Sequence, residues 1–317
     1  MAESKTARRW NAGGLRAAVT HMLRMESPAL AVDLLPEVGG KIGQIRDKFS
    51  GRDLLVPPQK PYCTIALHGD WLQGDTSGMD DCFPNIAAGP YPCVPWDAVQ
   101  LPDLGEWTHG QWDVVESSEH RAVLERDGIA LPYHARKMVC FVDDRTLELS
   151  YRVENRGDVA LRYMWSAHPL IAAPAEYELR LPPGDMTFRT FPSDGKLHTW
   201  PRFEALNLVR DWIPRGTNLK IFVTGLTAGW CELRLPGHTL RFTFDPGATP
   251  VVGVWFNNFG FPEDSPTPFR CVAVEPCTSQ SDLLDKLPAE AYPHIEAGGS
   301  AEWSFRLQVE AQRSTEA

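Results

Sequence analysis

The segment RTLELSYRVEN, residues 145–155, alternates apolar and polar side chains with a period of two. Successive side chains of an extended strand point to opposite faces, so the apolar positions of this segment share one face. These positions are Leu147, Leu149, Tyr151 and Val153. The same alternation returns over residues 303–309, and residues 233–244 carry it on both sides of the turn at Pro236-Gly237. The pattern therefore predicts strands joined by hairpins.

The composition favours the same fold class. The 317 residues include 27 prolines and 25 glycines, and turn formers at this density suit many short strands. Helical pattern is scarce, and the best candidate is SDLLDKL, residues 281–287, one or two turns with Ser281 placed to cap the first. No linker of distinct composition divides the chain. We therefore expect an all-β protein with one domain over residues 1–317 and a core from about residue 16 to residue 310.

Charge and cysteine content narrow the class of protein. The net charge of −10 repels the phosphates of nucleic acids, so we expect no nucleic-acid partner. No stretch of about 20 apolar residues predicts a membrane span, and MAESKTARRW at the start lacks the apolar segment of a secretory signal. The seven cysteines form no CxxC pair, which argues against a zinc site and a complete disulfide framework. A reducing cytoplasm fits these features.

The 11 tryptophans raise a carbohydrate hypothesis. An indole ring presents a flat apolar face, and such a face stacks well on the C–H face of a sugar ring. For any single tryptophan, filling the core is the more frequent role. A small-molecule carbohydrate is therefore the ligand class to weigh against a purely structural use of these rings.

His168 is a candidate acid or base. It lies in MWSAHPLI, residues 164–171, an apolar segment that follows the 145–155 strand. Pro169 restricts His168 to extended conformations, and an imidazole held in one place can titrate near neutral pH. The alternative is a core histidine whose ring nitrogens are satisfied by neighbours. Trp165 lies three residues earlier, on the opposite face of an extended chain, so we expect it in the core.

Glu275 is the second candidate. It closes the apolar run in FRCVAVEPCTSQSD, residues 269–282, and carboxylates are seldom buried without a partner. Desolvation would raise its pKa toward the range that a general base needs. The alternative is a glutamate that caps a turn or pairs with a neighbour such as Arg270.

Seven segments, in the same order along the chain, resemble those of one family. They are VGGKIGQIRDKFSGRDLL (38–55), GMDDCFPNI (78–86), LPDLGEWTHGQWDV (101–114), LPYHARKMVCFVDDRTLELSYRVENRG (131–157), MWSAHPLI (164–171), GVWFNNFGFP (253–262) and AVEPCTSQSDLL (273–284). The family is the aldose 1-epimerases of the galactose mutarotase-like superfamily. Each segment is a weak signal, and their common order is a more specific one.

The resemblance implies a galactose mutarotase-like β-supersandwich of large antiparallel sheets, with a site on a concave sheet face bordered by loops. In such enzymes the residue matching Glu275 takes the proton of the anomeric hydroxyl, and the residue matching His168, protonated, donates to the ring oxygen. The ring opens, the C1–C2 bond rotates, and the ring closes on either face. This chemistry needs no metal and no organic cofactor, and the sequence carries no metal, P-loop or dinucleotide motif.

One position departs from the family pattern. Where relatives often carry a histidine before a glycine, this chain has Leu104 followed by Gly105. His109 in the same loop, or His68 in the preceding loop, is a candidate substitute that would contact the substrate. The alternative for both is an ordinary surface-loop histidine.

Four further residues are candidate substrate contacts: Asp81, Arg136, Trp255 and Asn257. Asp80 and Asp81 are adjacent in a strand, so at most one of them faces the substrate. Trp255 would stack on the sugar, and Asn257 would bind its hydroxyls. The alternatives are a loop-stabilising aspartate and a solvated arginine on a strand face.

Two functional classes remain open from the sequence. The first is an aldose 1-epimerase (mutarotase)-like isomerase, and the second is a carbohydrate-binding β-sandwich protein without catalysis. Retention of both His168 and Glu275 favours the enzyme, whereas Leu104 favours the binding protein. A phosphorylated substrate is not favoured, because Glu106 follows Gly105 where phosphate-binding relatives carry an arginine nearby. An anionic or deoxy sugar, and a monomer or a homodimer, remain possible.

Overall fold

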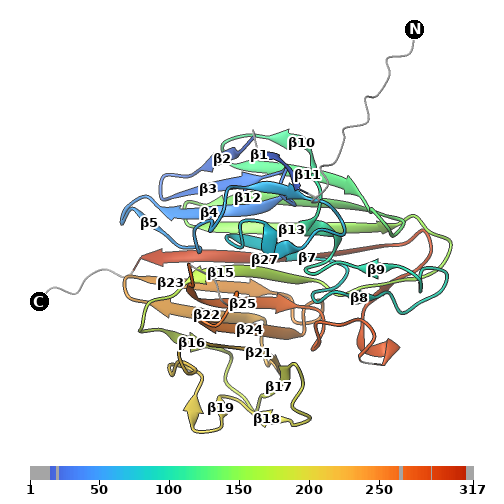
Figure 1. Cartoon of the computed structure of the whole chain (residues 1–317). Coiled ribbons are helices and arrows are strands. Elements are labelled where there is room, and N and C mark those ends of the chain that lie inside the picture. The colour runs from blue at the N-terminus through green and yellow to red at the C-terminus, as the bar shows by residue number, and fades with distance from the viewer. Residues whose placement is uncertain (1–14, 19–20, 264–266, 287, 312–317) are drawn as a thin grey trace, which may run out of the picture.

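The computed structural model describes residues 15–18, 21–263, 267–286 and 288–311 (Figure 1). Nearly all regular structure in these ranges is β-strand, as the sequence predicts. The helical turns among the described residues are three short 3-10 helices: η1 (Trp71–Gln73), η2 (Glu106–Thr108) and η3 (Ala289–Ala291). None of the described helices is long and apolar enough to cross a membrane.

The first large sheet has eight strands, all paired antiparallel. Their spatial order is β10 (Asp113–Ser117), β11 (Arg121–Asp127), β12 (Tyr133–Asp143), β13 (Thr146–Asn155), β27 (Ser300–Ala311), β23 (His238–Phe244), β22 (Trp230–Leu235) and β16 (Glu178–Arg180). Apolar residues alternate with polar ones in β13 and β27, and the apolar set is buried. This confirms the predicted strand faces.

The second large sheet has eleven strands, also paired antiparallel. Their order is β18 (His198–Thr199), β17 (Thr187–Phe191), β21 (Thr217–Thr224), β24 (Val251–Asn258), β25 (Arg270–Cys277), β15 (Ser166–Ala172), β7 (Met79–Cys82), β4 (Lys41–Asp47), β3 (Leu30–Leu35) and β2 (Leu23–Glu26), with β5 (Arg52–Asp53) on β4. Four two-stranded pairs complete the fold: β1 (Leu15–Ala18) with β6 (Cys63–Ile65), β14 (Leu161–Arg162) with β26 (His294–Ile295), β19 (Arg202–Phe203) with β20 (Leu206–Asn207), and β8 (Gly89–Pro90) with β9 (Gln100–Leu101).

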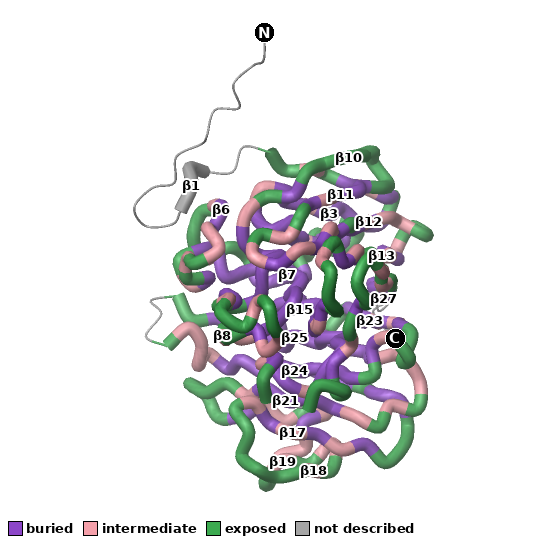
Figure 2. Tube along the Cα trace, turned by 90° about the vertical axis from the view of Figure 1, so that its right-hand side faces the viewer, coloured by how far each residue is buried: buried purple, intermediate pink, exposed green. Residues whose placement is uncertain are grey.

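The central strands of the eleven-stranded sheet are buried on both faces. Every residue of β7 and β24 is buried, and so are nearly all residues of β15 and β25 (Figure 2). A strand in a two-layer sandwich buries one face against the other sheet, so a second cover is needed for the opposite face. Long loops provide this cover, and polar side chains lie beneath them.

Aromatic rings fill the space between the two sheets. Trp165, just before β15, packs against Tyr151 of β13 and Trp303 of β27, with ring centroids 5.0 Å and 5.7 Å away. Trp107 stacks on Tyr151 at 5.7 Å and is fully buried in the same layer. Trp165 is therefore a core residue, as expected, and Trp107 also lies in the core.

Two of the predicted substrate contacts form ion pairs within the protein instead. Asp81 points between the sheets, where Lys137 binds one carboxylate oxygen and the Tyr151 hydroxyl donates to the other at 2.7 Å. Arg136, next to Lys137 in β12, points outward and pairs with Glu125 at the surface of the eight-stranded sheet. The predictions that Asp81 and Arg136 contact the sugar are therefore corrected, because the alternation of strand faces turns one side chain between the sheets and the other to the surface.

The predicted helix over residues 281–287 is also wrong for the residues described, 281–286, which form a turn. Ser281 accepts a hydrogen bond from the Leu283 N–H at 3.2 Å, so its hydroxyl closes a local turn without a helix following.

Lys137 and Arg136 give a matched test of the buried ion pair. We expect Lys137→Met to lower the free energy of unfolding by about 3–5 kcal/mol, because the Asp81 carboxylate would be left buried without its cation. Arg136→Met, on the exposed face of the same strand, should cost less than about 1 kcal/mol. Urea unfolding followed by fluorescence measures both, and equal costs for the two variants would contradict the assigned orientations.

Candidate active site

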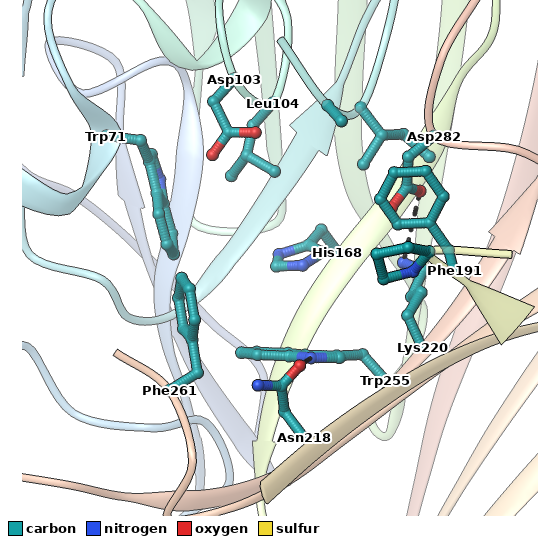
Figure 3. A pocket seen from close by; sticks show the side chains of 13 residues that line it. Trp71, Asp103, Leu104, His168, Phe191, Asn218, Lys220, Trp255, Phe261 and Asp282 are labelled. Atoms are coloured by element: carbon teal, nitrogen blue, oxygen red, sulfur yellow. Dashed lines mark hydrogen bonds and ion pairs between the residues drawn. The ribbon is translucent and has the colours of Figure 1, made fainter. Parts of the chain in front are cut away.

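A pocket lies on the loop-covered face of the eleven-stranded sheet, with a volume of about 240 Å³. His168, Lys220 and Asp282 line it from β15, β21 and the segment after β25. Aromatic side chains form its walls, and Figure 3 shows them gathered around His168. Residues of the irregular segments 83–88 and 102–105 and of the segment that follows β24 also contribute to the lining.

Strand register brings the two predicted reactive residues together. Ser166 pairs with Cys277 and Leu170 with Ala273, which places His168 opposite Glu275 on neighbouring strands. Residues that pair across strands project from the same face of a sheet. The 107 residues that separate His168 and Glu275 in sequence are therefore spanned by one step between β15 and β25.

His168 and Glu275 face each other in a nearly dry environment. His168 Nε2 lies 3.8 Å from Glu275 Oε1, and the two residues are 7% and 0% exposed. His168 Nδ1 and Glu275 Oε1 are buried and have no hydrogen-bond partner. Buried polar atoms are nearly always satisfied, so an unsatisfied atom on each of two neighbouring residues marks a place where a polar ligand gains hydrogen bonds.

Lys220 holds the other oxygen of Glu275. Its Nζ donates to Glu275 Oε2, which also accepts from the Ser166 hydroxyl at 3.2 Å. Lys220 Nζ lies 4.0 Å from Asp282 Oδ1, an oxygen that has no hydrogen-bond partner of its own (Figure 3). Gly253 makes room for this arrangement, since a Cβ there would lie 3.1 Å from Glu275 Oε2.

Burial and charge set the protonation of these groups. Burial raises the pKa of Glu275, and the Lys220 ammonium opposes that rise. Burial would lower the pKa of Lys220, but the Glu275 and Asp282 carboxylates raise it above its ordinary value. Burial also raises the pKa of Asp282 to about 6, with Lys220 opposing and Glu275 adding to the rise. Lys220 is therefore the fixed positive charge of the site.

His168 is held in its neutral form. Burial lowers its pKa well below the ordinary value, and the charges of Lys220 and Lys41 lower it further. Lys41 lies in β4, two strands from β15, and its Nζ binds Asp75 at 2.8 Å and Asp80 at 3.2 Å. Asp80 pairs with His168 across β7 and β15, so this second buried cluster adjoins the site.

The aromatic walls enclose a flat space. Trp255 lies nearly parallel to the His168 ring, with centroids 6.0 Å apart and planes at 25°, and Trp71 meets His168 edge-on at 6.3 Å. Phe261 packs edge-on against Trp255 at 5.3 Å. Asn218 also lines the pocket. Apolar faces with a few polar groups between them suit a ring that carries hydroxyls.

Leu104 occupies the rim of the pocket. Its φ of 58° is uncommon for a residue with a side chain, and its backbone N–H donates to Ile86. Gly105 follows with a φ of 74°, where a Cβ would lie 2.2 Å from the carbonyl oxygen of Phe83. The loop thus places an apolar side chain where the sequence resemblance leads us to expect an imidazole.

Neither candidate substitute for that imidazole lines the pocket. His109 is fully buried, and its two ring nitrogens lie 2.9 Å from the Gly105 carbonyl and 3.3 Å from the Gly69 carbonyl. His68 is exposed and lies outside the lining. Asn257 does not line the pocket either, because its side-chain amide forms hydrogen bonds with the backbone N–H and carbonyl of Phe261. Of the predicted binding residues, Trp255 alone lines this pocket.

Several lining residues were not predicted: Lys220, Asp282, Trp71, Asn218 and Phe261. Lys220 carries a signal comparable to that of Glu275, since it stands in the apolar run LKIFV of residues 219–223. Asp282 lies within the quoted segment 273–284. Trp71 begins the short 3-10 helix η1, Asn218 is an exposed residue of β21, and nothing local in the sequence distinguishes either of them.

Comparison with known proteins defines the fold. No protein-family model matches the sequence, and no curated protein matches it. Solved structures match over nearly the whole chain. The Slr1438 protein from Synechocystis is 15% identical, with a TM-score of 0.70, over 96% of this chain and 100% of that one. A candidate aldose 1-epimerase from Escherichia coli K12 is 18% identical, with a TM-score of 0.70, over 92% and 99%.

A galactose mutarotase-like protein from Lactobacillus casei is 16% identical, with a TM-score of 0.66, over 92% of this chain and 100% of that one. Identities this low show a shared fold and leave activity to be argued from the site. The chain has the galactose mutarotase-like fold, as the sequence resemblance predicts.

The protonation of His168 is open to direct measurement. In long-range ¹H–¹⁵N NMR spectra, we expect its ring to stay neutral as the pH falls through 6.5, because burial and two lysines disfavour the imidazolium. Lys220→Met should raise the pKa of His168, since it removes a nearby positive charge. Lys286→Met, whose ammonium pairs with Asp285, is the control. Titration of His168 above pH 6.5, or no change in Lys220→Met, would contradict this electrostatic picture.

Proposed function

We propose that the protein interconverts the α and β anomers of a sugar by acid–base ring opening, as an aldose 1-epimerase-like isomerase. The proposal rests on one observation: a buried histidine and a buried glutamate, 3.8 Å apart, both present an unsatisfied polar atom beside a pocket with aromatic walls. Structures with the same fold include candidate aldose 1-epimerases, and this likeness supports the same reaction class.

Glu275 is the proposed base. The Lys220 ammonium favours the ionised carboxylate, and Oε1 carries no hydrogen bond that would have to break first. Burial raises the basicity of that carboxylate above that of a surface glutamate. Oε1 takes the proton of the anomeric hydroxyl, and the electron pair of that O–H bond forms the C1 carbonyl as the bond from C1 to the ring oxygen breaks.

His168 is the proposed donor to the ring oxygen. Its lowered pKa disfavours a resting imidazolium, so a neutral ring N–H makes this hydrogen bond. Neutral imidazoles serve as proton donors in other buried sites. As Nδ1–H gives its proton to the ring oxygen, Nε2 takes the proton that Glu275 Oε1, 3.8 Å away, has removed from the anomeric hydroxyl, so the imidazole changes tautomer and stays neutral. After rotation about C1–C2, the reverse steps close the ring on the other face of the aldehyde.

The substrate that this geometry favours is a monosaccharide or a sugar end that fits about 240 Å³. Trp255 and Phe261 supply apolar faces, and Asn218 and Asp282 supply hydrogen-bonding groups. We further propose that the protein works in a reducing compartment such as the cytoplasm, since all seven cysteines are unpaired.

A carbohydrate-binding protein without catalysis is the second candidate. Two observations favour it: Leu104 stands at the rim where the sequence resemblance leads us to expect an imidazole, and Glu275 is not among the residues that line the pocket, whereas its partner Lys220 is. In that case the ion pair would be a structural element, and the aromatic walls alone would carry the binding.

Anomer exchange measured by NMR on freshly dissolved aldoses separates the two candidates. We expect the wild type to accelerate exchange for at least one sugar, and His168→Gln and Glu275→Gln each to slow it by at least about a hundredfold, because each removes one acid–base group. His109→Gln is the matched control, a buried histidine away from the pocket. Binding without acceleration of any sugar would instead establish the non-catalytic reading.

A further inference from the structure

A second and larger concavity adjoins the pocket. It has a volume of about 740 Å³ and is lined by residues 189–193, Gln280, Ser281, Leu283 and Lys286. We call it the side chamber. It shares Phe191 and Pro192 with the pocket described above, so the two spaces lie on either side of one wall. Figure 3 shows the Phe191 ring beside Lys220 and Asp282 at that wall.

Strand register aligns the side chamber with the reactive pair. Glu275 pairs with Gly253, Gly253 with Phe222, and Phe222 with Arg189. Residues paired in this way project from one face, so Arg189 stands on the same face of the sheet as Glu275. Three strand intervals separate them, roughly 14 Å at the usual spacing of 4.8 Å. Arg189 therefore lies over the same face of the sheet as a sugar bound at Glu275 would, on the side of β17.

The charges of the side chamber differ from those of the rest of the chain. The protein has a net charge of −10, yet the described lining of the chamber contains Arg189 and Lys286 and no carboxylate. The Arg189 guanidinium makes no hydrogen bond or ion pair with any described residue. Lys286 pairs with its neighbour Asp285 at 3.1 Å. An unpaired, half-buried arginine over a concavity is a ready partner for an anion.

We propose that the side chamber binds an anionic group, a carboxylate or a phosphate, carried by the substrate on the side remote from its anomeric carbon. This inference rests on the proposed anomer interconversion, because that reaction fixes which end of the sugar meets Glu275. A guanidinium binds a carboxylate or a phosphate through two parallel N–H···O hydrogen bonds, so the same site chemistry suits both anions. The choice of sugar in the experiment distinguishes between them. Phe191 and Leu283 would pack against the apolar part of the same molecule.

Three sugars that differ only at C6 test this proposal in the glucose and galactose series: the neutral aldose, the uronate and the 6-phosphate. We expect kcat/KM for anomer exchange to be at least about tenfold higher for the uronate or the 6-phosphate than for the neutral sugar. Whichever anion is preferred identifies the group. Arg189→Gln should reduce the ratio of anionic to neutral kcat/KM by at least about tenfold.

Arg202→Gln is the matched control, because Arg202 is an exposed arginine of the neighbouring β19 and lies outside the chamber lining. If Arg189→Gln does not fold, the ratio of anionic to neutral kcat/KM is measured in Lys286→Gln, a variant at another position of the chamber lining. The proposed anion site would be contradicted if kcat/KM were equal for all three sugars and neither variant changed the ratio of anionic to neutral kcat/KM. That result would leave the proposed anomer interconversion unaffected.

If none of these sugars is interconverted, calorimetric titration of the wild type and the same variants with glucuronate and inorganic phosphate still tests whether the side chamber binds an anion. Binding to the wild type that weakens at least about tenfold in Arg189→Gln supports it. Absent binding, or binding that Arg189→Gln does not weaken, would overturn it.

Discussion

The buried contact between Lys220 and Glu275 is the interaction on which the site depends. Removing two charges from water is costly, and the loss is recovered only when the ions meet in good geometry. Here Lys220 binds Oε2, Ser166 adds a hydrogen bond to the same oxygen, and Gly253 leaves the space in which they meet. Oε1 remains unsatisfied beside His168, so one carboxylate is half of an ion pair and still keeps one oxygen without a hydrogen bond, as the proposed base requires.

The fold makes this placement possible because the eleven-stranded sheet is covered on both faces. One face meets the aromatic layer around Tyr151 and Trp165, which fixes the strands in register. The other face lies under the long loops, where Trp71 and Leu104 reach over the polar side chains. Loops can change while the register stays, so a site of this kind can retain its reactive pair and alter the groups around it.

The sequence predicted the parts of the structure that depend on local pattern. Alternation in residues 145–155 gave the strand faces, and the apolar surroundings of His168 and Glu275 pointed to both. Assignments that depend on which face a side chain occupies failed: Asp81 lies between the sheets. Lys220 was missed because its partner lies 55 residues away in sequence, and a lone lysine in a strand does not reveal which carboxylate it meets. The prediction for His109 was wrong for a related reason, since only the folded loop shows that the imidazole is enclosed by the backbone carbonyls of Gly105 and Gly69.

A structure of the protein with a bound sugar would show whether the unsatisfied oxygen of Glu275 and the ring of His168 meet the anomeric centre. We expect the sugar between the aromatic walls, with its anomeric oxygen within hydrogen-bonding distance of Glu275 Oε1 and its ring oxygen toward His168. A sugar held in the same pocket with its anomeric carbon turned away from both residues would contradict this expectation, and it would make the ion pair a structural element of a binding protein.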